Sequence, residues 1–208
     1  MIEVQDLSFA YHGGKPLFEN LNFIVSDGEL LWVNGASGAG KTTLLYCLCG
    51  VIKKNITGRI YIDGRAISDI SCAELPGAAA MVFQEPGSRI FLSAVEDELA
   101  FTLENLCMNR EEMRERINDA LKLTGLTDKR HENPAKLSGG QIKLAALAAV
   151  LVYPPRVLLL DEITAGLDNL AVERVIDCVN MLRKKGCAVI VSDHNASIWR
   201  GGANELRI

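Results

Sequence analysis

The feature that most constrains this chain is a glycine-rich loop between an apolar segment and a helical one. Residues 35–42 read Gly-Ala-Ser-Gly-Ala-Gly-Lys-Thr and follow the apolar segment 29–33. The glycines let the backbone curl, so that several N–H groups face the β- and γ-phosphates of a nucleotide at a helix N-terminus. Lys41 adds positive charge, and the Thr42 hydroxyl can ligate Mg²⁺. An accidental glycine-rich turn is the alternative, but the flanking strand and helix argue against it. The predicted nucleotide-binding residues of this loop are Gly35, Ser37, Gly38, Ala39, Gly40, Lys41, Thr42 and Thr43.

A pair of carboxylates ends a second apolar strand. Residues 157–160 are Val-Leu-Leu-Leu, and Asp161 and Glu162 follow them directly. A buried strand that delivers Asp161 beside Thr42 could hold Mg²⁺, directly or through water. Glu162 points elsewhere and suits a general base that positions or deprotonates a water molecule. Such a pair can also be an ordinary acidic cap of the next helix. A metal-binding and catalytic role is indicated only because the phosphate loop occurs in the same chain.

The order of elements predicts an α/β fold with a parallel sheet. Strands are expected at 2–9, 17–25, 29–33, 60–62, 80–83, 157–160 and 188–192, the first two antiparallel. Helices are expected at 41–49, within 94–124, after the N-cap Ser138 and at 168–185. Strand and helix alternate in the C-terminal part, as in crossover units of a parallel sheet. We therefore predict one domain over 1–208, with a helical subdomain inserted at about 85–150.

Bulk properties limit the partners. The 208 residues carry a net charge of −4, which disfavours a nucleic-acid partner because phosphate backbones call for clustered Lys and Arg. The N-terminus lacks the pattern of a secretory signal. The longest uncharged apolar stretch, 144–155, is too short to span a bilayer. Any work at a membrane would therefore require an integral membrane partner.

Residues 137–141, Leu-Ser-Gly-Gly-Gln, point to a particular family. They form a second anion site at a helix N-terminus, although an ordinary capping box fits the same residues. The sequence resembles the signature of ABC ATPases and lies twenty residues before Asp161, the separation typical of that family. The resemblance implies a P-loop NTPase core of the ABC ATPase fold that binds ATP and Mg²⁺. It also implies that Ser138, Gly139, Gly140 and Gln141 face nucleotide bound to a second ATPase subunit, in an ATP-dependent homo- or heterodimer.

Further residues match the same family position by position. Gln84 resembles the Q-loop glutamine, which contacts Mg²⁺ or water, and Asp168 belongs to a segment that resembles the D-loop. His194 resembles the switch histidine that contacts the γ-phosphate, although a lone histidine is more often structural. Tyr11 resembles the aromatic residue that stacks on adenine, with a simple turn tyrosine as the alternative. Catalytic roles are thus expected for Glu162, His194 and Gln84, and metal roles for Thr42, Gln84 and Asp161.

The segment after Gln84 resembles a narrower group, the ATPases of energy-coupling factor importers. It reads Gln-Glu-Pro-Gly-Ser-Arg-Ile-Phe and continues into Val-Glu-Asp-Glu-Leu-Ala-Phe. Glu85 and Arg89 replace the Asp and Gln that are usual there. The resemblance implies a subunit at the cytoplasmic face of the membrane that energises import of a vitamin or transition-metal ion. After Gln141 the chain also departs from the family, because Ile-Lys-Leu stands where basic and polar residues ending in arginine are common.

Two other classes of protein share part of this pattern. A soluble ABC ATPase with a mechanical or regulatory role would share the same active residues, but the coiled coils of repair-type relatives would need sustained heptads, which are absent. A small-molecule P-loop kinase would leave the signature and His194 without a role.

Overall fold

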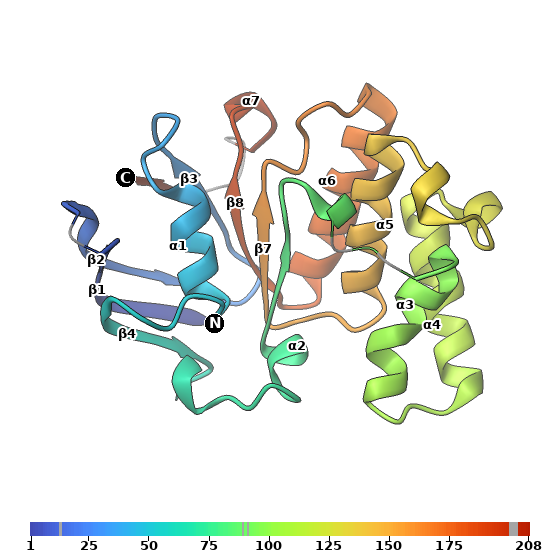
Figure 1. The fold of residues 1–208 in the computed structure, drawn as a ribbon, viewed down its shortest axis with the longest axis horizontal. Helices are drawn as coiled ribbons and strands as arrows, with labels where there is room; N and C mark the ends of the chain where they lie inside the picture. The colour runs from blue at the N-terminus through green and yellow to red at the C-terminus, as the bar shows by residue number, and fades with distance from the viewer. Residues whose placement is uncertain (13, 89, 91, 200–203) are drawn as a thin grey trace. The chain divides into compact units, whose positions relative to one another are not determined.

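A computed structural model describes residues 1–12, 14–88, 90, 92–199 and 204–208 (Figure 1). The chain folds into two compact units. The first consists of residues 1–81, 155–162 and 183–208, and the second of residues 82–154 and 163–182. The segment 85–150, predicted as a helical insertion, lies within the second unit.

The N-terminal strands of the first unit form an antiparallel sheet of order β2-β1-β4-β5. β1 and β2 pair antiparallel, with Ile2 opposite Val25, as the sequence predicts. β4 is longer than the predicted strand 60–62, and β5 is a short addition to it. The bounds are β1 Ile2–Ala10, β2 Pro16–Val25, β4 Ile56–Ile62 and β5 Arg65–Ala66.

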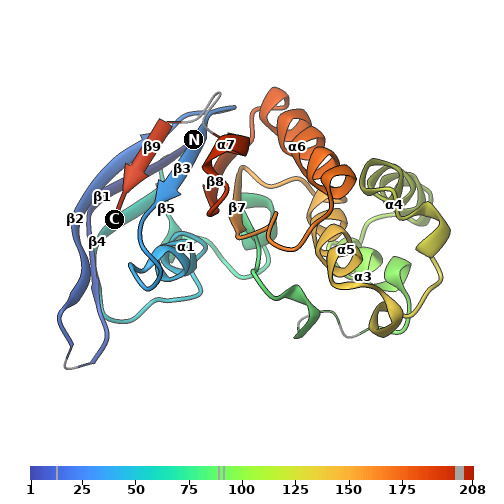
Figure 2. The ribbon, with the colours of Figure 1, turned by 90° about the horizontal axis from the view of Figure 1, so that it is seen from above.

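The second sheet has the order β6-β7-β8-β3-β9 and contains the predicted parallel pairs (Figure 2). Its strands are β3 Leu30–Asn34, β6 Ala79–Val82, β7 Val157–Asp161, β8 Ala188–Ser192 and β9 Asn204–Arg207. Every residue of β7 and β8 is buried, which explains their unbroken apolar sequences. Because β3, β7 and β8 are parallel, their carboxyl ends share one edge of the sheet. The residues that follow these three strands therefore meet there.

One hydrophobic core joins the two sheets of the first unit to α1 (Lys41–Leu48). Leu44, Leu45 and Leu48 of α1 are fully buried in it, together with Leu159 of β7 and Ile190 of β8. The N-terminus of α1 therefore lies on a rigid support next to the carboxyl edge of the parallel sheet.

The second unit is mainly helical. α5 (Gly139–Leu151) packs against α3 (Val95–Asn105) and α4 (Arg110–Thr124), which confirms helical structure within 94–124. Val95, Leu99 and Leu103 form the buried stripe of α3. Most of α6 (Asn169–Lys184) also belongs to this unit. The remaining short helices of the chain are η1 Ile67–Asp69, α2 Leu75–Ala78, η2 Pro86–Ser88, η3 Thr127–Lys129, η4 Pro134–Lys136 and α7 Ala196–Trp199.

In the described parts of the chain, no helix has both the length and the apolar character needed to cross a bilayer.

Candidate functional site

The glycine-rich loop curls between β3 and α1, as predicted. Gly38 and Gly40 have φ angles of 81° and 102°, which residues with a Cβ rarely adopt. Lys41 is the first residue of α1 and is 7% exposed. Its Nζ donates hydrogen bonds to the carbonyl oxygens of Gly35 and Ala36, at 2.9 and 3.0 Å. The loop thus holds an ammonium group at a helix N-terminus, where a phosphate would meet positive charge and backbone N–H groups.

At two positions of this loop, atoms from distant parts of the chain leave no room for a side chain larger than that of glycine. A Cβ at Gly35 would lie 2.7 Å from the carbonyl oxygen of Ile208, just after β9. A Cβ at Gly40 would lie 2.6 Å from the side chain of Leu17 on β2. β9 was not predicted, yet its pairing with β3 brings Ile208 to the phosphate loop.

Asp161 lies at the carboxyl end of β7 and is 1% exposed. Neither of its carboxylate oxygens has a hydrogen-bond partner of ordinary geometry within the described residues. Burial raises the pKa of the Asp161 carboxyl; the nearby Glu162 carboxylate adds to the rise, whereas the Thr42 and Ser192 hydroxyls and the Lys41 ammonium oppose it. Buried oxygens without hydrogen-bond partners, beside a threonine hydroxyl, fit the oxygen ligand set that Mg²⁺ prefers. Asp161 and Thr42 are therefore suited to hold this ion.

Glu162 and His194 are in direct contact. His194 Nε2 lies 3.1 Å from Glu162 Oε1, and the side chain of Glu162 is 19% exposed. β7 and β8 run side by side with Asp161 opposite Ser192, so the residue after β7 and the second residue after β8 come together. Glu162 has a φ angle of 46°, an unusual value for a residue with a Cβ, and its N–H donates to the Ser192 carbonyl at 2.7 Å. The sequence predicted each residue separately but not their contact.

Tyr11 follows β1 and is 57% exposed. Its ring meets the Phe9 ring edge-on, with centroids 4.8 Å apart. Its hydroxyl lies 3.2 Å from Thr43 Oγ1, so a hydrogen bond links it to the phosphate loop. An exposed aromatic face tied to that loop suits stacking on a nucleobase.

The second unit holds the other predicted residues. Ser138 is the N-cap of α5, and its hydroxyl accepts from the Gln141 N–H while the Gln141 side chain accepts from the Ser138 N–H. The capping box is thus confirmed. It leaves the Ser138 O–H proton available for donation, since a hydroxyl can accept and donate at once. A Cβ at Gly139 would meet nothing within 4 Å. The start of α5 is therefore open to an approaching anion.

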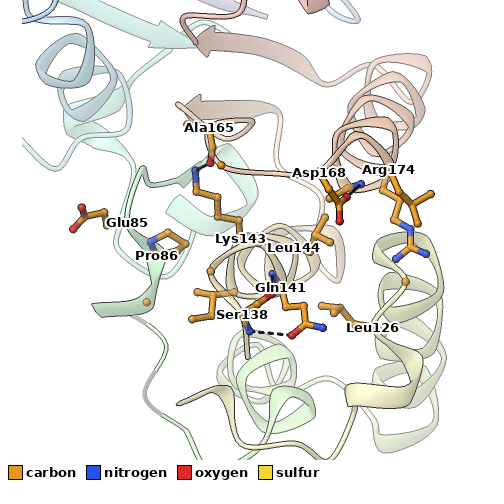
Figure 3. A pocket seen from close by; sticks show the side chains of 18 of the residues that line it. Glu85, Pro86, Leu126, Ser138, Gln141, Lys143, Leu144, Ala165, Asp168 and Arg174 are labelled. Carbon is orange, nitrogen blue, oxygen red and sulfur yellow. Dashed lines mark hydrogen bonds between the residues drawn. The ribbon is translucent and has the colours of Figure 1, made fainter. Parts of the chain in front are cut away.

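A pocket of about 680 Å³ surrounds the start of α5 within the second unit (Figure 3). Gln84 lines it from the segment after β6, and Asp168 from the loop before α6. Asp168 also caps α6, because its Oδ1 accepts from the Ala171 N–H at 2.8 Å. The predicted residues therefore form two sets, one in each unit. In the first unit they are Tyr11, Gly35, Ser37, Gly38, Ala39, Gly40, Lys41, Thr42, Thr43, Asp161, Glu162 and His194; in the second they are Gln84, Ser138, Gly139, Gly140, Gln141 and Asp168.

Lys143 lines this pocket, and in the sequence it is marked only as part of the Ile-Lys-Leu run that departs from the family pattern after Gln141. Its Nζ donates to the Ala165 carbonyl at 2.7 Å and links α5 to the loop that ends in Asp168 (Figure 3). Leu144 of the same segment is 4% exposed and belongs to the apolar core. Its neighbour Lys143 anchors a loop, which no local pattern indicates.

Lys143→Met should lower ATP turnover about fivefold, because a charge-assisted hydrogen bond to the Ala165 carbonyl is lost while the aliphatic stem is kept. Lys143→Arg should keep most of the activity. Lys122→Met, at an exposed position of α4, is the matched control. Turnover is measured by phosphate release at saturating ATP, and equal rates for the Met variant and the wild type would contradict this role for Lys143.

Comparisons with known sequences agree on one family. The sequence profile of the family described as ABC transporter matches residues 18–165. An ABC transporter ATP-binding protein of Pyrococcus abyssi is 43% identical over 212 residues, which cover 99% of this chain and 76% of the relative. EcfA of Methanocaldococcus jannaschii, an energy-coupling factor transporter ATP-binding protein, is 35% identical over 200 residues, 95% of this chain and 71% of EcfA.

Solved structures show the same fold. CbiO1 from Clostridium perfringens, described as part of the ABC transporter complex CbiONQ, matches with a TM-score of 0.85 and 32% identity over 99% of this chain and 83% of CbiO1. A dimeric ATP-binding cassette in a post-hydrolysis state, bound to ADP and phosphate, matches with a TM-score of 0.86 and 27% identity. That match covers 100% of this chain and 94% of the cassette.

Proposed function

This chain belongs to the ABC transporter family of ATP-binding subunits, which are ATPases, and from that premise we propose that it energises an energy-coupling factor-type importer. Its two units would form one ATPase domain, peripheral at the cytoplasmic face of the membrane. The cargo would be a vitamin or a transition-metal ion carried by integral membrane subunits. Similarity to EcfA and to CbiO1 supports this assignment.

The Glu162–His194 pair beside Asp161 is the observation that carries the ATPase mechanism. Lys41 would bind the phosphates, while Thr42 and Asp161 would hold Mg²⁺. The ion, when bound, would neutralise charge on the β- and γ-phosphate oxygens. Glu162 would orient the attacking water and take its proton, and His194, in contact with Glu162, would contact the γ-phosphate. Tyr11 would stack on adenine.

The second unit would complete the site of a partner ATPase subunit. Ser138 and the backbone of Gly139 and Gly140 would bind the γ-phosphate held by the opposite phosphate loop, which links dimer formation to ATP. Gln84 and Asp168 line the same pocket and would respond to that nucleotide. Similarity to a dimeric cassette supports this arrangement.

A second, smaller pocket of the second unit is our candidate for the membrane partner. It has a volume of about 420 Å³ and lies between the segment after Gln84 and the turn before α5. Ile90, Leu92, Pro134 and Ile142 give it an apolar lining. The apolar side chain of Ile142 would suit this surface to an apolar partner side chain. Arg89 and Phe91 of the same segment lie outside the described residues.

The experiment is affinity purification of the Glu162→Gln variant, with ATP, from detergent-solubilised native membranes. The substitution should stall hydrolysis and hold the closed dimer. Partners are identified by mass spectrometry, with Lys41→Ala as the control that cannot close. Recovery of a polytopic membrane protein with a small substrate-binding membrane subunit would support the importer. Recovery of soluble proteins alone would reject transport and favour a soluble ABC ATPase.

A further inference from the structure

A buried tryptophan holds the backbone next to His194. Trp32 lies in β3, is 3% exposed, and its Nε1–H donates a hydrogen bond to the Asp193 carbonyl at 3.0 Å. We propose that Trp32 is a positioning residue that fixes His194 against Glu162. The inference rests on the proposed role of His194 in ATP hydrolysis and names a residue outside the nucleotide site on which that role depends.

The loop after β8 is fixed from two sides. β3 lies between β8 and β9 (Figure 2), and Trp32 pairs with Val191 in the parallel register. The Ser192 carbonyl accepts from the Glu162 N–H, and the next carbonyl, that of Asp193, accepts from the Trp32 indole. The backbone is therefore held on both residues that precede His194.

His194 itself depends on this support because its side chain is 59% exposed. An exposed imidazole is not fixed by packing, so its position follows from the backbone that carries it. Asp193 Oδ1 accepts from the Asn195 N–H at 3.0 Å, which closes a tight turn around His194. Through its hydrogen bond to the Asp193 carbonyl, Trp32 thereby acts on the 3.1 Å contact between His194 and Glu162.

The chemical requirement at position 32 is a buried N–H donor on a large ring. An aliphatic or phenyl side chain could fill the same layer of the sheet, but neither can donate to a carbonyl. Trp32→Phe therefore removes the donor and keeps an aromatic ring in β3. The loop with Asp193 would then sample positions in which His194 moves away from Glu162.

The chain offers a matched control in its other tryptophan. Trp199 in α7 is 4% exposed, and its Nε1 has no hydrogen-bond partner among the described residues. Trp199→Phe makes the same change of volume in a buried site of the same unit without removing a hydrogen bond of the indole. The difference between the two variants isolates the contribution of the Trp32 N–H.

The experiment compares steady-state ATP hydrolysis by wild type, Trp32→Phe, Trp199→Phe, His194→Ala and the Trp32→Phe/His194→Ala double variant. Thermal unfolding of each variant checks that it folds. We expect Trp32→Phe to lower kcat about tenfold, while KM for ATP changes less than about twofold. Trp199→Phe should stay within about twofold of wild type. In the His194→Ala background, Trp32→Phe should cause almost no further loss, because its effect passes through His194.

The outcomes separate this inference from the proposed function. Equal kcat for the two tryptophan variants, or full additivity with His194→Ala, would overturn the role of Trp32 while the ATPase mechanism stands. Wild-type activity in His194→Ala would reject the mechanism itself. If Trp32→Phe does not fold, benzothienylalanine, which replaces the indole N–H by sulfur, is introduced at position 32 in the Trp199→Phe background. The same fall in kcat is then expected, and unchanged kcat overturns the inference.

Discussion

Replacing Glu162 by Gln is expected to lower ATP hydrolysis by about a hundredfold or more, the range found when a general base is removed. The Gln side-chain oxygen can occupy the position of Glu162 Oε1, which lies 3.1 Å from His194 Nε2. The site should therefore keep its geometry and its affinity for ATP, but it can no longer take a proton from water. Phosphate release measures the loss, and size-exclusion chromatography with ATP should show an accumulated dimer.

The same chemical change away from the site provides the control. Glu19 is exposed on β2, and Glu19→Gln should hydrolyse ATP at the wild-type rate without accumulating a dimer. More than a tenth of wild-type activity in Glu162→Gln would show that another group serves as the base. Loss of ATP binding would show instead that the carboxylate is needed to shape the site.

Motifs with a local chemical logic could be predicted from sequence. The glycines, Lys41 and Thr42 occur within eight residues, and their strand–loop–helix setting requires no knowledge of distant residues. The capping box of Ser138 and Gln141 is equally local, and the structure confirms it. Continuous apolar runs identified β7 and β8 because both strands are buried on both faces.

Features that depend on distant partners could not be predicted. β9 has the polar sequence Asn-Glu-Leu-Arg and becomes a strand by pairing with β3. β4 begins at Ile56 rather than at 60, because Gly58, which lowers strand propensity, allows the backbone of β1 to approach. A Cβ there would lie 2.4 Å from the Gln5 carbonyl oxygen. The bond from Trp32 to Asp193 spans 161 residues, so a sequence pattern marks Trp32 only as apolar.

Asp161→Asn is expected to have opposite effects on function and on stability. At pH 7 the free energy of unfolding of the nucleotide-free protein should rise by about 1 kcal/mol, because a buried charge, whose oxygens have no hydrogen bond of ordinary geometry to the described residues, is replaced by a neutral amide. Mg²⁺-dependent ATP hydrolysis should fall by about a hundredfold or more, because the amide lacks the charge that an ion ligand supplies. Such a conflict is typical of residues kept for chemistry rather than for folding.

The pH dependence follows from the direction of the pKa shift. Burial raises the pKa of Asp161 above its ordinary value of 3.8, so the folded protein binds this proton more tightly than the unfolded chain. As pH rises from 3.8 through the folded-state pKa, the wild type loses the stability that this tighter proton binding contributes. The advantage of Asp161→Asn should therefore be largest near pH 7 and shrink toward pH 4.

Urea denaturation at several pH values measures this difference, with Asp128→Asn, at a highly exposed carboxylate, as the control expected to change little. Adding MgATP should stabilise the wild type strongly and the Asn variant weakly, because a ligand that binds only the folded state raises stability more the tighter it binds. An Asn variant less stable than the wild type at pH 7 would mean that the Thr42 hydroxyl and the Lys41 ammonium compensate the buried charge in full. The carboxylate would then be part of the folded framework, and its retention would not require a metal ion.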